Sequence, residues 1–122
     1  MNRNLVKVLS VAAMVMMLGV AQRASADPVG GLVVRRDRVL PNYTDTWTLR
    51  CYGDEITQVT INGDGSTDLD LYVYDENGNL ICKDEGYSDD CVASFRPFWT
   101  QTMTIKVVNR GGRTNRYSFR AE

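Results

Sequence analysis

Aspartate residues are the part of this 122-residue sequence most able to do chemistry. Between positions 54 and 90 the chain carries 11 acidic residues against a single basic one, Lys83. Hard cations such as Ca²⁺ take about six to eight oxygen ligands, which carboxylates and loop carbonyls supply. The sequence therefore predicts a calcium site, with a solvated acidic edge that serves turns and discourages strand aggregation as the alternative. The predicted metal ligands are Asp68, Asp70, Asp84, Asp89 and Asp90.

The stretch from Asp68 to Leu80 predicts a β-hairpin around an Asn77-Gly78 turn. Its first arm alternates strictly, so that one face is apolar and the other carries Asp68 and Asp70. Alternate residues of a strand lie roughly 7 Å apart, which places the two carboxylates side by side. We expect both carboxylates to be exposed to solvent.

The residue types argue against enzymatic chemistry. The chain contains no histidine, so no Ser/His or Cys/His nucleophile can form. An EF-hand loop beginning at Asp64 would place Leu69 where glycine is required and Asp75 where glutamate is usual. Asp68 and Asp70 could serve a glycosidase, but a small sandwich offers little room for a desolvated cleft. We therefore predict no catalytic residues and no enzymatic activity.

Aromatic residues form a second class of candidate site. Tyr72 and Tyr74 share the outward face of the strand at 68–74, and Trp99 follows Phe98 in a predicted loop. Exposed rings stack on sugars or pack against proteins, whereas cross-strand aromatic pairs stabilise a sheet without binding anything. The candidate surface-binding residues are Tyr72, Tyr74 and Trp99, and their partner would be an extracellular protein or a polysaccharide.

Charge is unevenly distributed along the chain. Residues 96–122 contain six basic residues and one acidic residue, Glu122, in contrast to the acidic middle. Pairing between neighbouring strands explains part of this asymmetry. Arg110, Arg113 and Arg116 form a basic turn that could meet a polyanion, but the net negative charge argues against nucleic-acid binding.

Residues 1–26 predict a cleaved signal peptide. Arg3 and Lys7 accompany a 14-residue apolar run at positions 8–21, and Ala24-Ser25-Ala26 matches a cleavage site. A membrane-spanning helix would need about 20 apolar residues. We expect a secreted or periplasmic protein with no membrane contact after cleavage. The remaining 96 residues carry 11 basic and 15 acidic side chains, a net charge of −4.

The remainder of the chain predicts an all-β fold. Residues 27–45 form an N-terminal leader with a candidate first strand. Residues 46–122 form an antiparallel jelly-roll-like β-sandwich of about seven or eight short strands, separated by turn residues such as Asn62-Gly63.

The three cysteines are expected to play different parts. Cys82 and Cys91 bracket the loop 83–90 between two predicted strands, so an oxidising compartment favours a disulfide across the base of that hairpin. Cys51 shares the alternation of Trp47 and Leu49, which predicts a small buried thiol.

The order of residues from 63 to 80, with its paired aspartates, alternating core residues and Asn-Gly turn, resembles the bacterial pre-peptidase C-terminal domain. The later Phe95-x-Pro97, the strand 104–109 and the final Tyr117-Ser118-Phe119 resemble it too. The resemblance covers roughly positions 46 to 120. One departure is Gln101-Thr102-Met103, where relatives usually carry Gly-x-Tyr.

This resemblance implies a small, non-catalytic sandwich of the kind appended to secreted peptidases, some of whose relatives bind calcium, collagen or polysaccharide. The sequence contains no peptidase, so we expect the domain to act alone or with a separate partner. The predicted function is an exported binding or accessory module, stabilised by calcium, that contacts an extracellular or envelope macromolecule. The alternative is a metal-free structural or interaction protein of the cell envelope, or the partner of a separate secreted peptidase.

Overall fold

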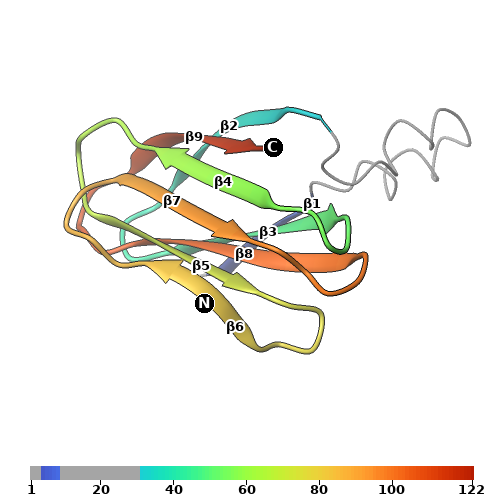
Figure 1. Cartoon of the computed structure of the whole chain (residues 1–122). Helices are drawn as coiled ribbons and strands as arrows, with labels where there is room; N and C mark the ends of the chain where they lie inside the picture. Colours follow the sequence, from blue (N-terminus) through green and yellow to red (C-terminus); the bar gives the residue numbers. More distant parts are fainter. Residues whose placement is uncertain (1–3, 9–30) are drawn as a thin grey trace, which may run out of the picture.

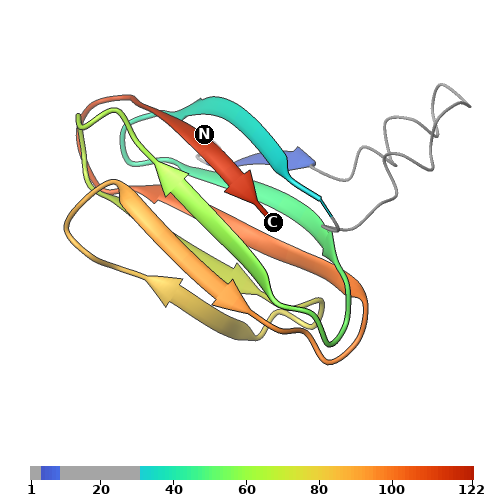
Figure 2. The same cartoon turned by 45° about the horizontal axis from the view of Figure 1, so that its top comes forward.

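The computed structural model describes residues 4–8 and 31–122, and all the regular structure in them is β-strand. Eight strands build a sandwich of two facing sheets (Figures 1 and 2). These strands are β2 (Val33–Val39), β3 (Thr44–Cys51), β4 (Thr57–Asn62), β5 (Leu69–Tyr74), β6 (Leu80–Asp84), β7 (Asp90–Phe95), β8 (Gln101–Asn109) and β9 (Asn115–Ala121). The described residues include no helix that could cross a membrane.

Each sheet is antiparallel within the sandwich. The first sheet has the order β3-β8-β5-β6, and the second has the order β2-β9-β4-β7. A ninth strand, β1 (Asn4–Val8), pairs in parallel with β3 at the edge of the first sheet. The predicted all-β sandwich is therefore confirmed, and every strand expected from the sequence is present.

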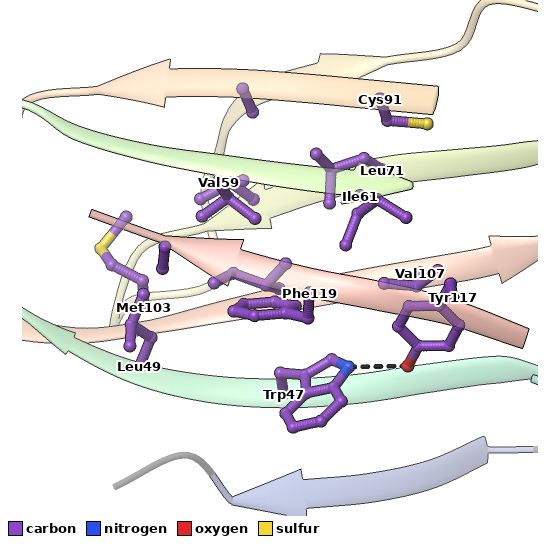
Figure 3. Close-up of a cluster of buried hydrophobic side chains, with 14 of the residues drawn as sticks. Trp47, Leu49, Val59, Ile61, Leu71, Cys91, Met103, Val107, Tyr117 and Phe119 are labelled. Atoms are coloured by element: carbon purple, nitrogen blue, oxygen red, sulfur yellow. Dashed lines mark hydrogen bonds between the residues drawn. The ribbon is translucent and has the colours of Figure 1, made fainter. Parts of the chain in front are cut away.

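Strict alternation of apolar and polar residues explains why these segments form strands with one buried face. β8 is the clearest case, since every second residue from Gln101 to Asn109 is buried. The threonine, valine and isoleucine residues that fill this strand favour the extended conformation. The inward side chains of both sheets form one hydrophobic core, which includes Trp47, Leu49, Ile61, Leu71, Met103, Val107, Tyr117 and Phe119 (Figure 3).

A polar contact crosses this core from one sheet to the other. The Tyr117 hydroxyl on β9 donates to Asp45 Oδ2 at 2.6 Å and accepts from Trp47 Nε1 at 2.9 Å (Figure 3). Asp45 and Trp47 both lie on β3, in the opposite sheet. Burial, together with the nearby Asp45 carboxylate, raises the pKa of Tyr117 well above its usual range. The hydroxyl therefore stays protonated and ties the two sheets together.

The N-terminal predictions fall largely outside the described residues. Of the predicted signal peptide, the structure describes only residues 4–8, which form β1, so the cleavage after Ala26 stays a prediction. Within the predicted leader, β2 pairs along its whole length with β9, from Val33 opposite Ala121 to Val39 opposite Asn115. The paired strands of the sandwich thus begin at Val33.

The predicted Cys82–Cys91 disulfide is not present, and all three cysteines are free thiols. The prediction assumed that the strands around loop 83–90 form a hairpin. Instead β6 pairs with β5 in the first sheet, while β7 pairs with β4 in the second. The loop therefore crosses between sheets, and the Cys91 thiol donates to the carbonyl of Leu69 at 3.1 Å. Cys51 is buried, as expected.

Thiol titration tests this correction. Burial raises the pKa of Cys51 to about 11 and that of Cys91 to about 12. Because the thiolate is the reactive form, the native protein should react with a disulfide reagent mainly at the half-buried Cys82. After unfolding without reductant, three thiols per chain should react. Recovery of only one would show that two cysteines had formed a disulfide.

Replacement of Tyr117 by phenylalanine tests the contact across the core. Tyr117→Phe removes both hydrogen bonds of the hydroxyl and should cost about 3 kcal/mol, because the buried Asp45 carboxylate loses a donor and the Trp47 Nε1 group loses an acceptor. For a domain of this size that is a fall in Tm of about 10 °C or more. Tyr74→Phe, on the outer face of β5, is the matched control and should change stability by less than about 0.5 kcal/mol. Equal effects of the two variants would contradict the assignment.

Candidate functional site

The first candidate site lies on the outer side of β5, where Asp70 is held by a network of polar side chains. Arg110 Nε donates to Asp70 Oδ2 at 2.8 Å, and Arg110 Nη2 donates to the Tyr72 hydroxyl at 2.9 Å. The Tyr72 hydroxyl in turn donates to Glu85 Oε2, and Lys83 Nζ lies 2.9 Å from Glu85 Oε1. The network joins β5, β6 and the turn after β8.

The expectation that Asp70 is exposed to solvent was wrong, since only 6 % of the residue is accessible. The cause is Arg110, which follows β8 in the chain and is anchored by its own N–H to the carbonyl of Asp68 at 3.0 Å. Because β8 pairs with β5, this turn brings the guanidinium over the strand that carries Asp70. An ion pair in this position buries the carboxylate, although local alternation alone would leave it in water.

Two carboxylate oxygens at this site have no hydrogen-bond partner in the described structure. They are Asp68 Oδ1 and Asp70 Oδ1, and both are buried. Burial is the main cause of the raised pKa of Asp68, and the neighbouring carboxylates of Asp70, Asp89 and Asp84 add to it. Negative charge therefore gathers here without full compensation.

The remaining predicted ligands are occupied by other contacts. Asp84 accepts from the backbone N–H groups of Gly86 and Val92, at 3.1 and 3.0 Å. Asp89 Oδ2 accepts from Gly65 N at 2.6 Å and from Asn115 Nδ2 at 2.9 Å. Asp90 lies on the outer face of β7 and accepts from Asn62 Nδ2 at 3.1 Å.

The five predicted ligands consequently do not form one ligand shell. The carboxylates of Asp70, Asp89 and Asp84 lie close enough to Asp68 to raise its pKa, whereas Asp90 lies on the outer face of β7 in the second sheet. Within residues 4–8 and 31–122, no three acidic or cysteine side chains are arranged as a metal-binding group. Calcium binding by these residues therefore stays a prediction, and the buried oxygens at this site that lack a hydrogen-bond donor are Asp68 Oδ1 and Asp70 Oδ1.

The second candidate site is the loop between β7 and β8, residues 96–100, which we call the aromatic loop. Phe98 is 91 % exposed and Trp99 is 49 % exposed. The loop is nevertheless fixed from two sides. Trp99 Nε1 donates to Glu76 Oε2 at 2.8 Å, and Gly53 N donates to Thr100 Oγ1 at 3.0 Å.

The segment after β3 also touches the aromatic loop closely. Asp54 N donates to the carbonyl of Pro97 at 2.6 Å. A Cβ atom on Gly53 would come within 2.4 Å of the Trp99 backbone, so only glycine allows this approach. The loop therefore presents an exposed aromatic side chain from a fixed backbone.

The other aromatic candidates are less available. The Tyr72 hydroxyl belongs to the network around Asp70, and the half-buried Tyr74 ring has Lys106 Nζ 5.3 Å from its centroid. Phe98 was not among the predicted binding residues, although it is far more exposed than either tyrosine. The available signal was two consecutive large aromatic residues directly after a proline.

Known proteins resemble this chain in fold only. No protein-family model matches the sequence, and no curated protein matches it. Among solved structures, the pre-peptidase C-terminal domain of a collagenase from Bacillus anthracis has a TM-score of 0.60 at 8 % identity, covering 100 % of this chain and 97 % of that one.

Two further solved structures share the fold. PliG of Aeromonas hydrophila, a periplasmic inhibitor of g-type lysozyme, has a TM-score of 0.62 at 11 % identity, covering 98 % of this chain and 97 % of its own. The Yersinia pseudotuberculosis-derived mitogen has a TM-score of 0.56 at 13 % identity, covering 78 % and 86 %. At these identities the comparisons establish a shared sandwich fold, which agrees with the fold that the family resemblance implied.

Neutralising Asp68 tests the uncompensated charge. The folded protein holds the Asp68 proton more tightly than the ordinary pKa of 3.8 would allow, so ionisation of this carboxylate costs stability at neutral pH. Asp68→Asn should therefore raise Tm by a few degrees at pH 7 in a chelating buffer. The gain should shrink as the pH falls through the raised pKa toward 3.8. Asp54→Asn, at an exposed aspartate, should show no such gain; a lower Tm for Asp68→Asn would contradict the charge argument.

Proposed function

We propose that this chain is an exported, non-catalytic binding module that contacts an extracellular or envelope macromolecule, in the first place a protein. The observation that carries the proposal is the aromatic loop. Exposed aromatic side chains that later become buried supply most of the energy in many protein interfaces. A loop that is already fixed loses little conformational entropy on binding, which leaves more of that energy as affinity.

The fold comparisons support the same class of function. PliG, which matches over nearly the whole of both chains, is described as a periplasmic lysozyme inhibitor, and so acts by binding another protein. The collagenase match is described as the pre-peptidase C-terminal domain of that enzyme. Export of the present chain rests on its predicted signal peptide.

Alanine substitutions in the aromatic loop test the proposal. The full chain is cross-linked to proteins of a periplasmic and secreted fraction, and g-type lysozyme is assayed separately as a defined probe. Phe98→Ala should lower the yield of the cross-linked partner at least about tenfold, as expected for the loss of an interface anchor. Tyr87→Ala is the matched control, because Tyr87 is 99 % exposed but lies in the loop between β6 and β7. Equal yields from both variants would exclude the aromatic loop as the binding surface.

Calcium binding remains a prediction within this proposal. Two observations favour a cation near β5. The buried oxygens Asp68 Oδ1 and Asp70 Oδ1 have no hydrogen-bond partner, and burial, together with the neighbouring carboxylates, raises the pKa of Asp68. Asp68 and Asp70 would contribute oxygen ligands, and the positive charge would offset their repulsion. Asp84, Asp89 and Asp90 could bind the cation only by giving up some of their present hydrogen bonds; otherwise they would not be ligands.

Thermal unfolding of the full chain, with excess Ca²⁺ and with chelator, tests calcium binding. A ligand at about 100 times its Kd that binds only the folded state adds about 2.7 kcal/mol, a shift in Tm of more than about 10 °C for this size. Asp68→Asn and Asp70→Asn should abolish the shift, and Asp90→Asn should leave it intact. If Ca²⁺ does not shift the Tm of the unmodified protein, the metal-free interaction protein is favoured. The proposal that the aromatic loop binds a partner would still stand.

A further inference from the structure

The outer face of the second sheet, opposite the sheet that carries the Asp70 network, contains an open hollow of about 640 Å³. Alternation turns Arg36 and Arg38 of β2, and Arg116 of β9, toward this face. All three side chains are exposed and line the hollow. We call these three residues the arginine triad.

The arginine triad concentrates like charge on two paired strands. In the β2–β9 register, Arg38 lies directly opposite Arg116, and Arg36 lies opposite Ser118. Directly opposed residues have Cβ atoms about 4.5–5.5 Å apart, and alternate residues along a strand lie about 6.6 Å apart. Like charges in opposed positions destabilise a sheet. Sheet stability therefore gives no reason for this arrangement.

No carboxylate within the described residues pairs with the triad. The basic residues that form ion pairs within the described part of the chain are Lys83, Arg96, Arg110 and Arg120. Two acidic residues also line the hollow. The Asp64 carboxylate accepts from Ser66 and from the backbone N–H of Arg116, while Asp37 accepts from the backbone N–H of Arg38. Among the described residues, neither carboxylate forms an ion pair with a guanidinium of the triad, and the hollow is lined by three positive and two negative side chains.

We propose that the arginine triad binds a linear anionic polysaccharide through its carboxylate or sulfate groups. A guanidinium group donates two parallel hydrogen bonds to such an oxyanion and keeps its charge at every physiological pH. The Ser118 hydroxyl and the Asn62 amide line the same hollow and offer hydrogen bonds to sugar hydroxyl groups.

The composition of the face favours a polysaccharide over other polyanions. Single-stranded nucleic acids stack their bases on aromatic rings, and none of the described residues turns an aromatic ring to this face; the Tyr117 ring points into the core. Protein interfaces are built around a central apolar anchor. Here the exposed apolar side chains are Val34, the next outward residue to Arg36 on β2, and Val92 on the opposite edge strand β7, so no apolar cluster forms at the centre of the triad.

Titration of the full chain with two defined probes tests this proposal: a heparin decasaccharide, which carries sulfate groups, and a decamer of galacturonic acid, which carries carboxylates alone. At least one should bind, and its affinity should fall steeply as salt is raised. Arg38→Gln/Arg116→Gln should weaken binding more than tenfold. The control Arg50→Gln/Arg96→Gln removes the same charge from β3 and the aromatic loop, and should weaken binding less than threefold.

Three results would overturn the proposal: binding to neither probe, equal loss of affinity in the two double variants, or tighter binding of single-stranded DNA or an acidic peptide of equal charge. Thermal unfolding supplies an independent check. Because Arg38 and Arg116 repel one another, Arg38→Gln/Arg116→Gln should match or exceed the Tm of the unmodified protein. A lower Tm would show that the two arginines serve the fold instead.

Discussion

The packing of the two inner sheet faces against each other is the constraint on which the rest of the structure depends. Phe119 and Trp47, from opposite sheets, lie with ring centroids 4.9 Å apart at the centre of this contact (Figure 3). Since side chains alternate along a strand, a slip of one residue would turn a whole set of apolar side chains into water. The core therefore fixes the register of the strands around it. That register determines which polar side chains share an outer face, including the aspartates of β5 and the arginines of β2 and β9.

A sheet with a fixed register also fixes the backbone of the loops that contact it. The aromatic loop rests on Gly53, at the end of β3, and on Glu76, in the hairpin after β5, so elements of the first sheet support both sides of it. Their positions are set by the core rather than by the loop itself. This is why Phe98 can stay exposed on an ordered backbone, a combination that surface loops seldom achieve without such support.

The features that local sequence rules govern were predictable, and those that depend on distant residues were not. The β5–β6 hairpin follows from Asn77-Gly78, where Gly78 adopts a φ of +83° and Asp75 accepts the backbone N–H of Asn79. The burial of Asp70 depends on Arg110, forty positions away, and no local pattern indicates it. The disulfide prediction failed for a related reason, because adjacency in sequence suggested a hairpin where the chain in fact changes sheets.

The uneven charge along the chain is explained only in part by pairing between strands. The acidic middle and the basic C-terminal segment do meet, since Arg110 covers Asp70 through the pairing of β8 with β5. The same explanation fails for Arg116, whose neighbour across the β9–β2 pair is Arg38. Neutral residues at 38 and 116 would satisfy the fold equally well, because both positions face solvent and bury no core surface. Opposite charge would stabilise a repulsive pair at such positions, and in the described part of this chain no carboxylate forms an ion pair with either guanidinium.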